Sequence, residues 1–281
     1  EKIINNFSEP IQLDGHEILS NEYKVASFQM MDSLLILSTG QDTIFHVYSK
    51  NKLHIKSFGR KGKGPNEFQR VPFLHSISKE NDTIRSVVHD EIAHHVVKIN
   101  FSKSIKTGSV SSEILDFSTD LIKETLINQI FYLGEDKYIG LYDDQYHQTQ
   151  NKQSGGFKYD MAKNNYELFP LYNLKIEPFK PFGAMNTNNR DLSPDREKFF
   201  TAMKHVPIVE VINVRDLKAT QYIIGNGIPE GEYKLSDYKN KELPEYFLDI
   251  YVTDRFVYLL ESENSPLNSD AGQRIKVLDR S

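Results

Sequence analysis

Residues 58–68 read FGRKGKGPNEF, and this stretch indicates how the whole chain is built. Its three glycines allow backbone angles that other residues rarely adopt, and its proline fixes the path of the chain. A degraded copy, GNGIPEGEY, occupies residues 225–233. Each copy follows a short apolar run typical of a strand and precedes another such run. A connector that recurs at matching points predicts a fold made of repeats.

An acidic turn followed by a short apolar or β-branched run returns five times along the chain. The runs that follow alternate with a period near two and are too short for helices, which is the signal of β-strands. Each repeat has room for about four antiparallel strands, as in one blade of a β-propeller. We therefore predict an all-β propeller with five visible blades; the competing interpretation is a β-sandwich with chance similarity. The five turns contain Asp32, Asp82, Asp136, Asp195 and Asp254.

Two segments are less regular than these repeats. Residues 112–126 have loosely helical apolar spacing, but an outer strand followed by a linker fits them equally well. Residues 1–20 are expected to supply a closing outer strand, which is a common way for a propeller to cover its edges. We predict one domain over residues 1–281.

The composition excludes several classes of protein. A net charge of −5 argues against a nucleic-acid partner, which normally requires a basic surplus. The absence of cysteine excludes disulfides, cysteine nucleophiles and thiolate metal sites. No apolar run approaches the roughly 18 residues that cross a membrane. The sequence begins at Glu1, so we expect that a leader with a signal peptide or lipid anchor has been removed.

Three stretches resemble the TolB-like six-bladed propellers of the bacterial envelope, with a looser similarity to NHL repeats. GRKGKGPNEF is similar to that family's connector after its first blade. Residues 192–214 resemble its unit that begins with Ser-Pro-Asp, and residues 89–99 resemble an NHL turn and strand. The resemblance implies six blades, and two alternatives follow for the last one: it is incomplete in this chain, or the ring closes in another way. It also implies export, often with a lipid anchor, and says little about activity.

The strand order of a blade predicts where the elaborated loops meet. If the strands of a blade are lettered a to d, the b–c turns share one end with the connectors that lead to the next blade. The glycine-rich connectors and two long polar insertions then lie on the same face. Repeat proteins usually bind partners on such a face. The segments concerned are 59–68, 143–156, 225–233 and 261–272.

Arg60, Lys61 and Lys63 form a basic cluster in the first connector. The motif is not a phosphate loop, because the lysine and hydroxyl residue of G-x-x-x-x-G-K-[ST] are missing and no helix is expected to follow. The cluster is a candidate for binding an anionic ligand or the acidic patch of a partner. Its alternative is a solvated group of charges.

The insertion in the third repeat offers a second set of candidates, Asp143, Asp144, Tyr146 and His147. Two carboxylates and a histidine could hold a cation or act as acid and base. His205, on the fourth b–c loop, could join them. Adjacent aspartates on a polar loop are also commonly only solvated.

A set of acidic residues and histidines resembles a metal cluster at first sight: His89, Asp90, Glu91, His94 and His95. The H-E-x-x-H signature is absent, and His94 and His95 are neighbours on a strand that point to opposite faces. We therefore interpret this region as a turn and strand, with His89, Asp90 and Glu91 on a b–c loop. The sequence predicts no metal ligands and no cofactor.

These observations favour an exported envelope propeller that acts as a binding scaffold for an unknown protein or small molecule. A membrane would be contacted only through a removed lipid anchor. The alternative is a metal-dependent hydrolase or lactonase-type propeller with carboxylates and histidine at the channel mouth. Enzymatic activity is left open.

Overall fold

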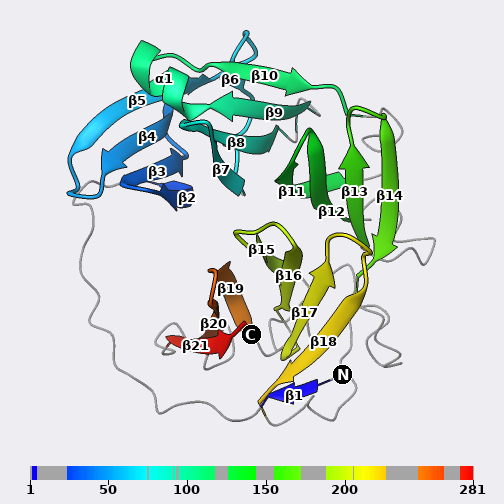
Figure 1. Ribbon diagram of the computed structural model, residues 1–281. Helices are drawn as coiled ribbons and strands as arrows, with labels where there is room; N and C mark the ends of the chain where they lie inside the picture. Colours follow the sequence, from blue (N-terminus) through cyan, green and yellow to red (C-terminus); the bar gives the residue numbers. More distant parts are fainter. Residues whose placement is uncertain are drawn as a thin grey trace, which may run out of the picture. The chain divides into compact units, whose positions relative to one another are not determined.

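The computed structural model describes residues 2–4, 24–74, 76–90, 92, 95–117, 126–143, 155–171, 188–204, 206–225, 246–262 and 273–280. The chain is an all-β propeller with five visible blades of mostly four antiparallel strands, which confirms the predicted fold class (Figure 1). The strands divide between two compact units. The first unit comprises residues 14–146 and 155–168, and the second comprises residues 1–13, 147–154 and 169–281.

The first unit carries three sheets. The first blade runs in the order β2 (Val25–Met31), β3 (Leu34–Thr39), β4 (Thr43–Ser49), β5 (His54–Lys61) and β6 (Glu67–Phe68). The second blade consists of β7 (Ser76–Glu80), β8 (Thr83–Asp90), β9 (His95–Asn100) and β10 (Ser112–Leu115). The third blade consists of β11 (Leu126–Gly134), β12 (Lys137–Asp143), β13 (Gly155–Asp160) and β14 (Asn165–Pro170), whose last residues belong to the second unit.

The second unit carries two sheets. The fourth blade consists of β15 (Asn188–Leu192), β16 (Lys198–Met203), β17 (Ile208–Asn213) and β18 (Ala219–Ile224), and β1 (Lys2–Ile4) pairs in parallel with β18. The fifth blade consists of β19 (Phe247–Val252), β20 (Phe256–Ser262) and β21 (Gln273–Asp279). The N-terminal strand is thus an outer strand of the fourth blade.

The five acidic turns lie where the sequence predicts them, between the first two strands of each blade. In the second blade Asn81 and Asp82 have φ angles of 46° and 59°, and in the third Glu135 and Asp136 have φ angles of 51° and 55°. Two successive positive φ angles are the geometry of the type I′ turn, which matches the twist of the strands that it joins. Asp and Asn tolerate this backbone better than most side chains, which explains the acidic signal.

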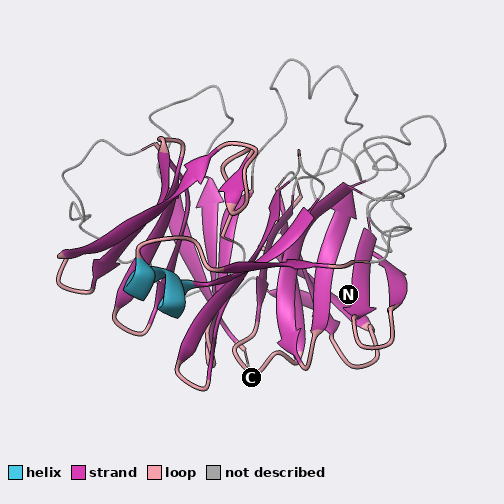
Figure 2. Ribbon diagram, turned by 90° about the horizontal axis from the view of Figure 1, so that it is seen from above, coloured by secondary structure: helices cyan, strands magenta, loops and turns pink. Residues whose placement is uncertain are grey.

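Residues 112–126, for which a helix and an outer strand were both considered, begin with a strand. β10 forms the outer strand of the second blade, and residues 118–125 lie outside the described ranges. The helix lies earlier, as α1 (Phe101–Thr107), and it is the one helix among the described residues (Figure 2). Asn100 caps its start by accepting from Lys103 N. No helix in the described ranges is long and apolar enough to span a membrane.

The core consists of apolar side chains between neighbouring sheets. In the first unit, Phe45 lies 5.6 Å from Phe58 and from Phe68 and 5.4 Å from Phe101, measured between ring centroids. Phe58 and Phe68 are the two ends of the glycine-rich connector, so burial of both rings anchors it. Gly59 lies within β5 directly after buried Phe58, and Gly225 directly follows buried Ile224 at the end of β18; their φ angles are 83° and 91°.

Replacement of these glycines should give a graded loss of stability. A Cβ at Gly59 would lie 3.0 Å from Phe45 Cδ2, so Gly59→Ala combines backbone strain with crowding and should cost about 1 to 3 kcal/mol. A Cβ at Gly225 would have its nearest atom, Lys276 Nζ, at 4.0 Å, so Gly225→Ala should cost about 1 kcal/mol of stability from backbone strain alone. The control is Gly40→Ala, because Gly40 has no positive φ and its added Cβ would lie 3.5 Å from the nearest atom, Lys24 Cβ. Urea unfolding of the three variants checks this order, which an equal loss in Gly40→Ala would contradict.

Candidate functional site

The glycine-rich connector is braced by its own carboxylate. Glu67 Oε2 accepts a hydrogen bond from Gly64 N at 2.9 Å. A Cβ at Gly62 would lie 1.9 Å from the same oxygen, so a larger residue there would displace the Glu67 carboxylate from this position. Since a carboxylate already fills the concave side of the loop, the connector is built as a rigid turn and has no nest left for a phosphate.

The three cations of the connector are all exposed. Lys61 Nζ donates to Gly40 O at 2.9 Å, which ties the loop to the end of β3. The side chains of Arg60 and Lys63 make no hydrogen bond or ion pair with the part of the chain that the structure describes. A rigid loop therefore presents at least two cations that have no acidic partner among the described residues of the first unit.

The connector continues onto the second blade. Ser112 Oγ donates to Asn66 Oδ1 at 2.7 Å, and Gln69 N donates to Asp90 Oδ2 at 3.0 Å. Asp90 and His89 are the last residues of β8 and are 3% and 9% exposed. The interpretation that they lie on an exposed loop was wrong. The strand extends to Asp90 because the connector covers it and supplies a donor to its carboxylate.

The second set of candidates lies almost wholly outside the described residues. Asp143 ends β12 and its side chain is not among those described; Asp144, Tyr146, His147 and His205 fall in ranges that the structure does not describe. Their cation or acid–base role stays a prediction. Within the described ranges, no group of three or more His, Asp or Glu side chains could hold a metal ion.

The second unit contains a carboxyl group with a strongly altered pKa. Asp191, in β15, accepts hydrogen bonds from Val252 N at 2.7 Å and from Leu192 N at 2.8 Å. Burial raises the pKa of Asp191 to about 7, the two backbone donors oppose this shift, and the charge of Asp249 adds to it. Both carboxylate oxygens are used by backbone groups, so we interpret Asp191 as a tie between the fourth and fifth blades.

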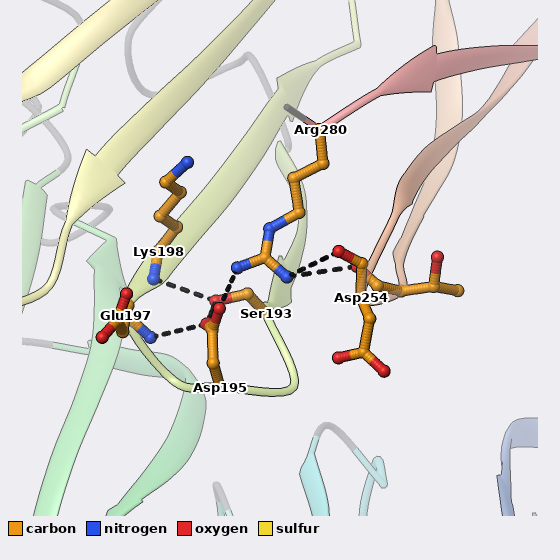
Figure 3. Close-up of polar contacts among 7 residues, drawn as sticks. Ser193, Asp195, Glu197, Lys198, Asp254 and Arg280 are labelled. Atoms are coloured by element: carbon orange, nitrogen blue, oxygen red, sulfur yellow. Dashed lines mark hydrogen bonds and ion pairs between the residues drawn. The ribbon is translucent and has the colours of Figure 1, made fainter.

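The Ser-Pro-Asp turn of the fourth blade forms another tie to the fifth blade (Figure 3). Arg280 donates to the Asp195 carboxylate, to Thr253 O at 3.3 Å and to Asp254 O at 3.4 Å. Its side chain is only 9% exposed. Ser193 Oγ and Glu197 N also donate to Asp195 Oδ1. Partial burial opposes ionisation of Asp195, but these donors together hold its pKa below the usual value.

The fold has clear counterparts among solved structures. No protein-family model and no curated protein matches the sequence. A protein of Bacteroides fragilis that is described as exported aligns with a TM-score of 0.60 and 12% identity, covering 99% of this chain and 76% of that chain. A DUF4221 member from Bacteroides vulgatus aligns with a TM-score of 0.59 and 13% identity, covering 92% and 79%. At such identities the likeness shows a shared β-propeller fold and nothing of function.

The pKa of Asp191 predicts a pH-dependent effect of Asp191→Asn. Since its folded pKa lies above the ordinary 3.8, Asp191 favours folding at low pH, and this contribution is lost as the pH rises through about 7. The Asp191→Asn variant, which does not titrate, should therefore gain stability relative to the parent between pH 5 and pH 8, by up to a few kcal/mol. Urea unfolding across this range measures the difference.

Asp195→Asn is the matched control for that experiment. The folded pKa of Asp195 lies below the ordinary value, so its carboxylate is ionised in both states over the same range. The stability difference between Asp195→Asn and the parent should stay constant from pH 5 to pH 8. A pH-independent difference for Asp191→Asn would show that its carboxyl is not protonated near neutral pH.

Proposed function

We propose that this chain is an exported bacterial envelope propeller of the TolB-like kind that serves as a non-catalytic binding scaffold. The likeness to a Bacteroides protein described as exported supports this localisation, and a lipid anchor remains part of the proposal. The surface that engages the partner is the basic loop, defined as residues 60–66. Its partner is a protein or ligand with an acidic patch.

The observation that carries this proposal is the rigid display of Arg60 and Lys63. A loop whose conformation is fixed by Glu67 loses little entropy when it binds, so more of the interaction energy appears as affinity. Neither side chain has an ion pair with any residue of the first unit that the structure describes. The net charge of −5 on the whole chain disfavours binding of nucleic acid. The local cluster of cations attracts an acidic partner and orients it toward this loop.

The hydrolase alternative depends on the carboxylates and histidines of residues 143–147 and on His205. These residues carry no described side chains, and no observation in the described ranges favours that function.

Charge reversal at the basic loop tests the scaffold proposal. The double variant Arg60→Glu/Lys63→Glu should bind a fluorescent decaglutamate peptide at least tenfold more weakly than the parent at low salt, as measured by anisotropy. About 0.5 M salt should remove the binding of the parent, because exposed charges are screened. The control Lys50→Glu/Arg215→Glu makes the same change of net charge at exposed sites elsewhere and should bind like the parent. Failure of the parent to bind, or equal loss in both variants, would refute the role of the loop.

A further inference from the structure

A cavity of about 240 Å³ lies beside the basic loop, in the first unit. Its walls come from one sheet face of the second blade and from α1. The register places Arg85 opposite Asn100 across β8 and β9, and Lys98 opposite Glu113 across β9 and β10. Facing residues share one side of a sheet, so these four side chains line the same surface. Lys103 of α1 adds a third cation.

Two of the cations have acidic partners outside the cavity wall. Arg85 Nη1 lies 3.0 Å from Glu80 Oε2, and Lys98 Nζ lies 3.5 Å from Asp136 Oδ1. The Lys98 ammonium also lies 5.2 Å from the centre of the Tyr132 ring. These contacts fix both cations in position, and they leave part of their charge to act on whatever enters the cavity.

The remaining two charged groups have no ion pair among the described residues. Lys103 uses its backbone N–H to cap the helix through Asn100 Oδ1, while its side chain is exposed. Glu113 lies opposite Lys98 in register without an ion pair to it. A cation and a carboxylate that both lack partners therefore line one cavity together with the Asn100 amide and the Ser112 hydroxyl.

A buried tyrosine hydroxyl on the third blade feels the same charges but is not part of the cavity wall. Tyr138, on the third blade, is fully buried, and its Oη has no hydrogen-bond partner. Burial raises the pKa of Tyr138, and the charges of Asp136 and Glu113 raise it further, so the hydroxyl stays a neutral donor. A buried donor without a partner is rare in proteins, and an ordered water commonly completes it.

We propose that this cavity binds a small hydroxylated oxyanion of the size of one sugar acid or sugar phosphate. The volume holds about eight waters, which suits a single monosaccharide ring. Lys103 takes the anionic group, with Arg85 and Lys98 adding positive potential. Glu113 accepts from a ligand hydroxyl, and the Asn100 amide nitrogen donates to another. The cavity adjoins the basic loop through the Ser112–Asn66 hydrogen bond, but its cations are different from those of the loop and its ligand is different from the proposed partner.

Titration calorimetry with four probes tests the proposal at low ionic strength. D-Glucuronate carries a carboxylate and glucose 6-phosphate carries a phosphate, both on a glucose-type ring. Glucose is the neutral control. L-Serine keeps a carboxylate but has an ammonium group in place of the ring hydroxyls. We expect saturable binding of at least one of the two anions, with glucose at least tenfold weaker. Which anion binds more tightly distinguishes a carboxylate from a phosphate ester as the ligand group.

Two lysines on α1 provide matched variants. Lys103→Gln should weaken binding of the preferred anion about tenfold, the loss expected for one charge-assisted hydrogen bond. Lys106→Gln removes the same charge one turn away, outside the cavity wall, and should bind like the parent. Both positions are exposed, so equal thermal midpoints are expected and confirm that folding is intact.

Four outcomes would overturn the proposal. They are the absence of saturable binding by either anion, equal binding of glucose, equal losses in Lys103→Gln and Lys106→Gln, or binding of L-serine that is tighter than that of both anions. The variant Arg60→Glu/Lys63→Glu should keep its affinity for the anion. The experiments can therefore refute the proposal for the basic loop and the proposal for the cavity separately.

Discussion

Apolar packing between neighbouring sheets is the interaction on which this structure depends. Each of three core clusters joins two successive blades. One joins the first and second blades around Phe45, one joins the second and third around Tyr138, and one joins the fourth and fifth around Phe247. Full burial of one such side chain contributes about 1.5 to 3 kcal/mol, whereas an exposed ion pair contributes about 1 kcal/mol at most. A single blade has no comparable core of its own, so its sheet is stable only beside a neighbour.

Polar ties then fix how the packed sheets align, and the acidic turns supply several of them. Asp32 pairs with Lys79 of the next blade at 2.8 Å, Asp136 pairs with Lys98 of the preceding blade at 3.5 Å, and Asp195 pairs with Arg280 of the next blade. The same aspartates sit in or beside turns where positive φ angles occur. One residue type thus meets two demands, since a short polar side chain tolerates the turn and its charge reaches the adjacent blade.

The sequence alone predicted the features that depend on local backbone preference. Strand alternation and the turn aspartates located four-stranded blades, and the glycines at 59 and 225 marked two positions where positive φ occurs. Features set by a neighbouring blade escaped prediction. Asp90 is buried because Gln69 N reaches it, and Asp191 is held by Val252 N, 61 residues away. α1 was missed because seven residues carry too short a pattern to register as helical.

The candidate sites follow the same division. The basic loop was visible in the sequence because its residues are consecutive, while the cavity residues are spread over β8, β9, α1 and β10 and meet only through strand register.

Whether turn aspartates tie neighbouring blades is tested most directly by a double-mutant cycle with Asp195→Asn and Arg280→Met in urea unfolding. A coupling free energy of about 1 to 3 kcal/mol is expected for this multiply hydrogen-bonded pair, in which the Arg280 side chain is 9% exposed and the Asp195 side chain 43%. Single effects that add to within about 0.5 kcal/mol would contradict the tie.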